Sequence, residues 1–338
     1  MAEIKIIRVR FMNSRTIVIE DNNIESLRQR YPEGLHFVVG DLHGEVLTLV
    51  KLMDKIRFDP DKDHIYFVGD YNGGGDTQTL LKYMSNYYQE DHEVPGFHMI
   101  RGNHERELSP FFELGNLPDI MVVRTDHLNY YIVHAGMVSA AFDLINRNME
   151  DEPGRKVYAY RLENNTCCYD APLRQIIWSL HGLYSQRSRW HVWPSENKLM
   201  EHRTVIVHGH SPYSFFIKDA WNSYGDNNLF WEKQHMYFCE ELHSFNVDSD
   251  IKGRNANGER YRGLSCICLE VYDEIASDNN GLLTIDKITG YENGVFAAEL
   301  DRSYRNVPLG DKNVILDARP QMKTITLDES GRLVLCMT

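Results

Sequence analysis

The chain has 338 residues, and its 36 basic and 49 acidic side chains give a formal net charge of −13 at pH 7. With 42% hydrophobic residues and only 23 glycines and 11 prolines, the composition excludes a disordered or collagen-like chain. The acidic balance argues against bulk binding of nucleic acid or an anionic membrane, although bound metal ions would still allow a phosphate-bearing substrate.

No targeting signal is expected at the N-terminus, because Lys5, Arg8 and Arg10 stand where a signal peptide needs an apolar stretch. The longest charge-free apolar region, residues 128–142, is too short for a membrane span, so no membrane association is expected. The six cysteines are sparse and form no CxxC pair, which favours reduced thiols and predicts a cytoplasmic protein.

Residues 1–35 are predicted to form an N-terminal β-hairpin extension, because two short apolar stretches flank a polar turn at Asn13 and Ser14. From residue 36 onward, five short apolar runs appear, each followed at once by polar residues. These runs are 36–39, 65–68, 98–100, 130–133 and 204–207. Such runs are typical of strands buried on both faces.

Helical patterns separate the first of these runs. Residues 46–56 follow a helical period, and Asp76 is a suitable N-cap for a helix that continues to Met84. This alternation predicts an α/β fold, with a core over residues 36–275. A further helix is expected over 140–148.

The later segments differ in composition. Residues 212–244 are rich in aromatic side chains and are interpreted as an insertion or lid, whereas Gly263 to Leu269 is predicted to be a strand. The remainder, residues 276–338, is predicted to be a C-terminal β region. Its alternation begins near Leu283, Ile285 and Ile288 and ends in a hairpin turned at residues 329–331.

The polar residues after the five apolar runs form a mixed set of nitrogen and oxygen donors. They are Asp41, His43, Asp70, Asn103, His104, His134 and His210. Ligands collect at the carboxyl ends of parallel strands, so these side chains should meet at one edge. The set suits Mn²⁺, Fe or Zn²⁺ better than Ca²⁺, and a shared carboxylate permits two ions roughly 3.5–4 Å apart, as in phosphoryl hydrolysis.

Taken singly, each of these residues is a weak signal. His134 alone is typical of a core histidine. His36, His64 and His98 are expected to pack or to hydrogen-bond near the starts of their strands. The joint pattern, with each donor directly after an apolar run, is what favours a metal centre.

Several blocks together resemble the phosphoprotein-phosphatase branch of the calcineurin-like metallophosphoesterases, of the bacterial serine/threonine phosphatase or diadenosine-tetraphosphatase type. The blocks are GDLHG at 40–44, GD at 69–70, RGNHE at 101–105, HAG at 134–136 and GH at 209–210. The resemblance covers about residues 36–270. It implies two mixed β-sheets packed as a sandwich and flanked by helices, to which this chain adds its β-rich C-terminal region.

The resemblance also implies roles for individual residues. Asp41 and His43 would hold a first divalent ion, Asp70 would bridge both ions, and the second would be completed by Asn103, His134 and His210. Mn²⁺ is the favoured metal, with Fe or Zn²⁺ as the other options. His208 lies on the same strand face as His210, and the family pattern favours His210 as the ligand.

The implied reaction is attack on phosphorus by a hydroxide that bridges the two metals. Arg101 would clamp the phosphate oxygens, and His104 would protonate the leaving oxygen. Glu105 is expected to support the loop rather than to react.

The second block departs from the family pattern GDxxDRG. Gly73 and Gly74 stand where the family has Asp and Arg, and a one-residue deletion would instead place Asn72 at the Asp. Asn72 is therefore expected to orient His104 by accepting a hydrogen bond, without the charge of an Asp. A second departure is Leu180, where relatives carry an Arg close to a Trp; Arg187 and Arg189 are interpreted as a solvated basic segment.

The favoured function is a metal-dependent phosphoesterase that hydrolyses phosphomonoesters, with protein phosphoserine or phosphothreonine as one substrate class. Hydrolysis of dinucleoside polyphosphates is an alternative, since aromatic side chains in 212–244 could stack a nucleobase, although core packing is more typical. The lost Asp and Arg motivate an alternative of another class, a metal-retaining but catalytically impaired binding protein. A purely structural sheet protein ranks last. The expected partners are a phosphorylated protein or a small phosphate ester or nucleotide.

Overall fold

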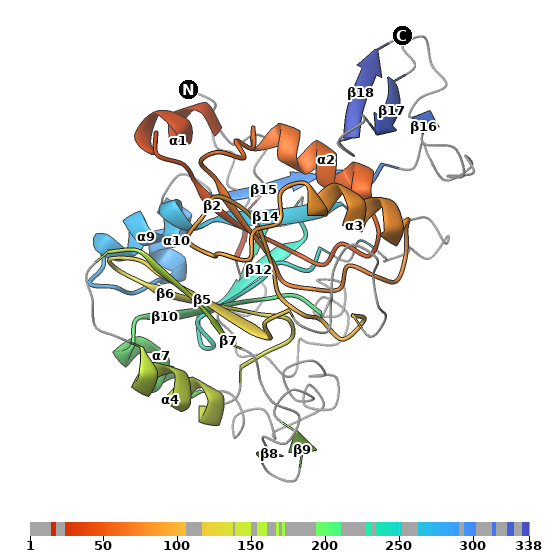
Figure 1. The fold of residues 1–338 in the computed structure, drawn as a ribbon. Coiled ribbons are helices and arrows are strands. Elements are labelled where there is room, and N and C mark those ends of the chain that lie inside the picture. The colour runs from red at the N-terminus through yellow and green to blue at the C-terminus, as the bar shows by residue number, and fades with distance from the viewer. Residues whose placement is uncertain are drawn as a thin grey trace.

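The structure is a computed structural model. It describes residues 15–17, 24–105, 117–137, 139–149, 154–160, 167–168, 171–172, 194–210, 228–231, 234–249, 251, 263–290, 294–301, 313–315, 323–327 and 333–337. Two large β-sheets face each other at its centre, with helices on the outer sides (Figure 1). Among these residues, every helix is too short or too polar to cross a lipid bilayer.

The first sheet has five strands in the order β15-β14-β2-β3-β4. The strands are β2 (His36–Val39), β3 (His64–Phe67), β4 (Gly96–Met99), β14 (Leu264–Cys268) and β15 (Val295–Ala298). β2, β3 and β4 run parallel, whereas β14 is antiparallel to both β2 and β15. Every residue of β2, β3 and β4 is buried, as expected for strands covered on both faces.

The second sheet has eight strands in the order β1-β11-β12-β13-β10-β6-β5-β7. In chain order they are β1 (Arg15–Ile17), β5 (Ile120–Arg124), β6 (Asn129–Val133), β7 (Lys156–Tyr160), β10 (Thr204–His208), β11 (Asn228–Trp231), β12 (Met236–Cys239) and β13 (Ser244–Asn246). β6 and β10 are parallel, so the apolar runs at 130–133 and 204–207 end on the same side.

Alternating side chains assign the two faces of the larger sheet. Met121, Tyr130 and Val207 belong to the large apolar core between the sheets. Tyr131 and Ile206 belong instead to a second apolar cluster on the opposite face. This alternation follows from the two-residue period of a strand, and it gives the sheet two buried faces.

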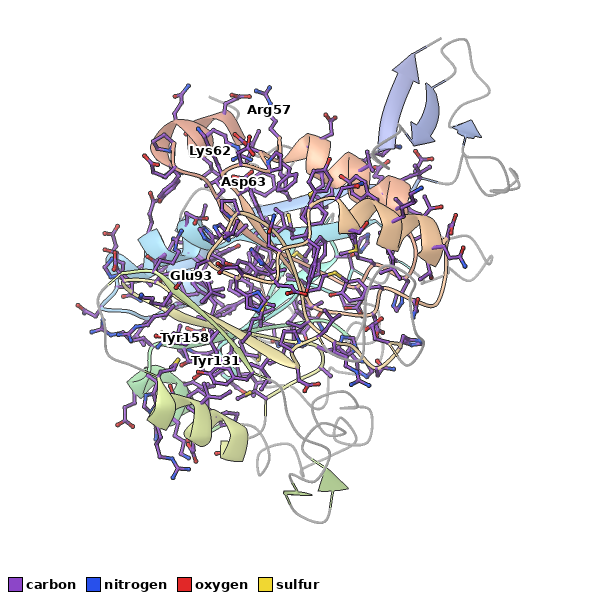
Figure 2. All side chains as sticks on the ribbon, in the orientation of Figure 1. Arg57, Lys62, Asp63, Glu93, Tyr131 and Tyr158 are labelled. Atoms are coloured by element: carbon purple, nitrogen blue, oxygen red, sulfur yellow. The ribbon has the colours of Figure 1, made fainter. Side chains whose placement is uncertain are left out.

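Helices cover the outer faces of both sheets. They are α1 (Ile24–Arg30), α2 (Val46–Lys55), α3 (Thr77–Ser85), α4 (Ser139–Asn148), α7 (Glu196–Glu201), α9 (Leu269–Ser277) and α10 (Ile285–Gly290). Figure 1 shows α2 and α3 together beside the five-stranded sheet, and α4 and α7 beside the eight-stranded sheet. Tyr131 and Tyr158, labelled in Figure 2, contribute to the cluster that packs with Phe142 of α4.

The helices expected at 46–56, after Asp76 and at 140–148 are confirmed, and so is the strand near 264–268. Asp76 caps α3, since its carboxylate accepts the backbone N–H of Thr79. The fold is therefore the predicted α/β sandwich of two mixed sheets flanked by helices.

The predicted β alternation near residue 285 is wrong, because Ile285 and Ile288 lie in α10. Their spacing of three residues places both on one helix face, where both are buried. The predicted core boundary also differs from the structure. Residue 275 falls inside α9, and β15 beyond it completes the five-stranded sheet.

The N-terminal region contributes more than the predicted hairpin. β1 pairs in parallel with β11, and the first half of the hairpin lies outside the described residues. α1 was not predicted. Its Arg28 forms two hydrogen bonds, of 2.5 and 2.6 Å, with the carboxylate of fully buried Asp63, which is labelled below α1 in Figure 2. A charge-assisted bidentate pair of this kind attaches α1 to the core.

The predicted lid over 212–244 is also wrong in the part that the structure describes. β11 and β12 are inner strands of the eight-stranded sheet, and Trp231, Tyr237 and Phe238 are buried. Trp221 and Tyr224 lie outside the described residues. Trp231, Tyr237 and Phe238 are therefore core residues, whereas Phe230 of β11 is half-buried.

Short sheets complete the described chain. β16 (Asn313–Ile315), β17 (Lys323–Leu327) and β18 (Leu333–Met337) form an antiparallel three-stranded sheet. The pairing of β17 with β18 confirms the hairpin predicted around residues 329–331. β8 (Cys167–Cys168) and β9 (Ala171–Pro172) form a two-stranded ladder.

Candidate metal centre

The predicted donor residues follow the carboxyl ends of β2, β3, β4, β6 and β10. The parallel alignment of β2, β3 and β4 in one sheet brings three of these ends together. The parallel alignment of β6 with β10 does the same for the other two ends in the second sheet. The backbone N–H of Gly209 donates to the carbonyl oxygen of His134 at 2.8 Å, which joins the loops after β6 and β10.

One group of donors consists of Asp41, His43 and Asp70, and the ligand atoms of all three lie within 4.8 Å of one another. Nε2 of His43 is 3.9 Å from Oδ2 of Asp41 and 3.9 Å from Oδ2 of Asp70. All three side chains are buried.

A second group consists of Asp70, His134 and His210, again within 4.8 Å of one another. Nε2 of His134 is 3.3 Å from Oδ1 of Asp70 and 3.1 Å from Nδ1 of His210. Asn103 belongs to the same point, because its Oδ1 lies 2.8 Å from the His134 nitrogen and 2.9 Å from the His210 nitrogen. Asp70 is thus common to both groups.

The rings of His43 and His134 are oriented so that Nε2 of each ring faces the carboxylates. Nδ1 of His43 lies 2.8 Å from the carbonyl oxygen of Asn72, and Nδ1 of His134 lies 2.8 Å from that of Val68. A carbonyl only accepts, so Nδ1 carries the proton in both rings. In the neutral imidazole Nε2 is then an acceptor, and backbone contacts of this type are how ligand histidines are oriented in metal sites.

These donors fit a pair of divalent cations. Nε2 of His134 faces the Asn103 carboxamide oxygen and the Asp70 carboxylate, and all three atoms are acceptors. Acceptors that converge in this way are better satisfied by a cation than by one another. Two ligand atoms at about 2.1 Å from one ion, at right angles, lie about 3 Å apart, which is close to the spacings between Asn103, His134 and His210.

The local backbone at the donors adopts a conformation that most residues avoid. His43, Asp70 and His210 have positive φ angles of 46°, 54° and 66°. Strained conformations of this kind cluster at functional sites, because the surrounding structure must enforce them. Gly209 is required for close approach, since a Cβ there would lie 2.0 Å from Oδ1 of Asp41.

Crowded carboxylates dominate the electrostatics. Burial raises the pKa of Asp41 well above its usual range, and the charges of Asp248 and Asp70 raise that pKa further. Burial, with the charge of Asp70 added, also raises the pKa of Glu105 to about 8. Opposite charge nearby favours the ionised form of a carboxyl, so cations bound at this position would reverse both shifts.

His104 lies at the solvent side of the centre. Its side chain is 42% exposed, and its Nε2 is 3.7 Å from Oδ2 of Asp70. Its ring meets that of His43 edge-on at a centroid distance of 5.6 Å. The imidazole is therefore both next to the predicted bridging carboxylate and open to a bound substrate.

The expectation for Asn72 is wrong in its geometry. The side-chain amide of Asn72 donates to the backbone carbonyl oxygen of His104 at 3.2 Å, so this bond holds the loop rather than the ring. Arg101 begins the same loop, and its backbone N–H donates to the carbonyl oxygen of Pro118 at 2.8 Å. Its side chain is half-buried.

His208, Leu180, Arg187, Arg189 and Asp248 are the other residues in question. His208 belongs to neither donor group, and its Nδ1 lies 3.2 Å from the carbonyl oxygen of Gly209. Leu180, Arg187 and Arg189 lie outside the described residues. Asp248 is a buried carboxylate whose charge raises the pKa of Asp41, and the sequence analysis assigns no role to it. The sequence signal was weak, since only Val247 separates Asp248 from the polar Asn246 that ends β13.

Comparison with known proteins gives the following matches. The family model described as calcineurin-like phosphoesterase matches residues 37–248, which is more than half of the chain. A curated relative, the symmetrical bis(5'-nucleosyl)-tetraphosphatase from Actinobacillus succinogenes, is 30% identical over 120 residues. That match covers 30% of this chain and 44% of the relative, so the chain spans less than half the length of that protein.

Solved structures with weaker similarity include two phosphatases. A protein serine/threonine phosphatase from Saccharomyces cerevisiae is 14% identical, with a TM-score of 0.38, over 71% of this chain and 74% of that one. A cold-active protein-tyrosine phosphatase from a psychrophilic Shewanella species is 15% identical, with a TM-score of 0.37, over 70% of this chain and 77% of that one.

Proposed function

The chain belongs to the calcineurin-like phosphoesterase family, and we propose that it is a dinuclear metallophosphatase that hydrolyses phosphomonoesters. Protein phosphoserine and phosphothreonine are the substrates we favour. The observation that carries this proposal is the position of Asp70, whose carboxylate is shared by the two donor groups. A shared carboxylate is what a pair of closely spaced ions requires.

The proposed ligands follow the two groups. Asp41, His43 and Asp70 hold one ion, and Asp70 with Asn103, His134 and His210 holds the other. When bound, such ions polarise the phosphoryl group and lower the pKa of a water nucleophile. The mixed nitrogen and oxygen donors support Mn²⁺ as the metal, with Fe and Zn²⁺ as the other options.

Two side chains of the same loop are proposed to act on the substrate. His104 is the proton donor to the leaving oxygen, which its exposure and its position beside Asp70 support. Arg101 is proposed to bind phosphate oxygens through its planar guanidinium group. Asn72 supports His104 through the backbone bond and not through the ring.

A second candidate function is hydrolysis of dinucleoside polyphosphates. It is favoured by the match to the bis(5'-nucleosyl)-tetraphosphatase. Stacking of a base on Trp231, Tyr237 or Phe238 does not support it, because these side chains are buried in the sheet. The third candidate, a binding protein that keeps its metals but turns over slowly, is favoured by Gly73 and Gly74 in the second block.

We also infer the location of the protein and its partners. Cys239, Cys266 and Cys268 are buried free thiols, which supports a cytoplasmic location. The net charge of −13 argues against bulk binding of nucleic acid, whereas bound cations would still allow phosphorylated proteins or small phosphate esters as partners.

A substrate panel tests these functions directly. The full chain with added Mn²⁺ is assayed on p-nitrophenyl phosphate, phosphoserine and phosphothreonine peptides, and diadenosine tetraphosphate. We expect turnover of the ester and the peptides, with loss of activity in Asp70→Asn. Preference for the nucleotide would support the second candidate, and bound metal without turnover of any compound would overturn the enzymatic proposal.

A further inference from the structure

The carboxylate of Glu105 is buried and surrounded by backbone donors of two different loops. Its Oε2 accepts the N–H of Gly102 at 2.6 Å and of Asp70 at 2.9 Å. Its Oε1 accepts the N–H of Tyr71 at 2.7 Å and of Asn72 at 3.4 Å. Only 1% of the residue is exposed, so backbone N–H groups rather than water are the partners of its two oxygens.

The contact between the two loops is reciprocal. Oδ1 of Asp70 accepts the backbone N–H of His104 at 3.0 Å, while Glu105 accepts the N–H of Asp70. The carboxylate of each loop thus binds the backbone of the other. We call these contacts between residues 70–72 and 102–105 the carboxylate clasp.

The clasp acts on Asp70, one of the three donor residues of the centre that have a positive φ angle. Asp70 has a φ of 54°, which a residue with a Cβ adopts only when its surroundings enforce it. The loops approach so closely that a Cβ on Gly102 would lie 2.4 Å from Oδ1 of Asp70 and 2.7 Å from Oε2 of Glu105. Gly102 is therefore required for the clasp to close.

We propose that Glu105 is a positioning residue that places Asp70 for the simultaneous binding of two cations. The inference rests on the proposed dinuclear site. Glu105 does not touch the substrate; its two oxygens set the position of the 69–72 backbone and hence the direction of the Asp70 carboxylate. Without it, the two donor groups remain present but no longer share one carboxylate at the required place.

The test uses Mn²⁺ as the probe and reads the metal site without turnover. The full chain and its Glu105→Gln variant are titrated with Mn²⁺ by calorimetry and examined by electron paramagnetic resonance. In the Glu105→Gln variant, an amide nitrogen, which is itself a donor, replaces one of the two acceptor oxygens. The two backbone N–H groups that donate to that oxygen therefore lose their hydrogen bonds. We expect the affinity for the second ion to fall about 10–100-fold, as for other residues that orient metal ligands. The spectrum should change from that of two coupled ions to that of isolated ions.

Glu270→Gln is the matched control. Glu270 is likewise buried and accepts a backbone N–H, that of His36 at 2.9 Å, but at the opposite end of β2 from Asp41. This variant should retain the coupled spectrum of the wild type. A general effect of removing a buried carboxylate would change both variants alike and would overturn the proposal.

Two negative results have different meanings. A wild-type chain that binds no coupled pair of ions contradicts the proposed function itself. A folded Glu105→Gln variant that keeps the coupled pair at wild-type affinity contradicts only the role of Glu105.

If the Glu105→Gln variant does not fold, amide hydrogen exchange measured on the wild-type protein tests the clasp instead. In the metal-free protein, the amides of Asp70, Tyr71 and Gly102 should exchange more slowly than that of Gly74, which is exposed in the same loop. Equal exchange rates would show that the clasp is not formed, and the proposal would then be wrong.

Discussion

Histidines occur in two different surroundings in this molecule, within the five-stranded sheet and after the ends of β2 and β6. Within β2, β3 and β4, the rings of His36 and His64 stack at a centroid distance of 4.4 Å, and those of His64 and His98 at 5.2 Å. After the carboxyl ends of β2 and β6, the ring nitrogens of His43 and His134 face the carboxylates of the metal centre instead.

The neighbouring charges explain the difference. Among the described residues, the stacked set, which we call the histidine stack (His36, His64 and His98), pairs with the carboxylate of Glu270 through His36. Glu270 is also paired with Arg155 at 2.9 Å. At the other end, Asp41 and Asp70 are buried side by side with imidazoles. Asp41 and Asp70 thus give the histidines after these strand ends a metal-binding environment that the histidine stack does not have.

Removing the shared carboxylate should have the largest effect. In Asp70→Asn, both donor groups lose their common anionic ligand, so we expect kcat/KM for p-nitrophenyl phosphate to fall to the level of the uncatalysed control. Steady-state kinetics with added Mn²⁺ provide the measurement. The His64→Asn variant of the histidine stack should keep its turnover, and inactivation of both variants would erase the contrast between the two ends.

His104→Asn should reduce kcat about 10²–10⁴-fold, the range for loss of a general acid. Its ring is exposed at the metal centre and belongs to neither donor group, so metal content should not change. Kinetics combined with metal analysis separate these two effects. Loss of metal together with activity would instead make His104 a ligand.

Arg101→Ala should raise KM and lower kcat, with a combined loss of roughly 10–100-fold in kcat/KM. The reason is removal of a charge-assisted contact to the phosphate, and the metal content should stay constant. Unchanged kinetics would remove Arg101 from the site.

The smallest effect concerns the histidine stack and the stability of the metal-free protein. Burial lowers the pKa of His64 to about 3 and that of His98 to about 2, so the folded protein keeps both neutral, while the unfolded chain protonates them below pH 6.5. The contribution of these two histidines to the free energy of unfolding is therefore fully present above pH 6.5 and is lost as the pH falls. When the pH is lowered from 7 to 5, each of these histidines should reduce the free energy of unfolding by about 2 kcal/mol.

The control for this effect is His98→Phe. Asp41 and Glu105 have raised pKa values and respond to pH with the opposite sign, so the wild type alone does not isolate the stack. Urea unfolding at both pH values should show that the wild type loses about 2 kcal/mol more than His98→Phe. An identical pH dependence of the two proteins would contradict the interpretation.

The donor residues were predictable because each follows an apolar run. Burial on both faces makes the strands visible as short runs, and the parallel pairing of β2 with β3 explains why Asp41 and Asp70 meet. The expected single sheet edge was wrong, because His134 follows β6 of the other sheet and meets Asp70 across the two sheets. The expected structural role of Glu105 was also confirmed, although the identity of its four backbone donors was not foreseen.

Other features depend on tertiary contacts that the sequence pattern does not contain. The side chain of Asn72 reaches either the ring or the backbone of His104, and only the loop path decides between them. The aromatic side chains of β11 and β12 look alike in a lid and in a buried strand, since composition does not reveal sheet order. α1 is short, and its attachment to Asp63 spans 35 residues.

The most direct test of the account is anomalous diffraction from crystals of the full chain grown with Mn²⁺. We predict two peaks roughly 3.5–4 Å apart, on either side of the Asp70 carboxylate. A single peak, or a pair of peaks away from Asp70, would contradict the claim that this carboxylate joins two cations.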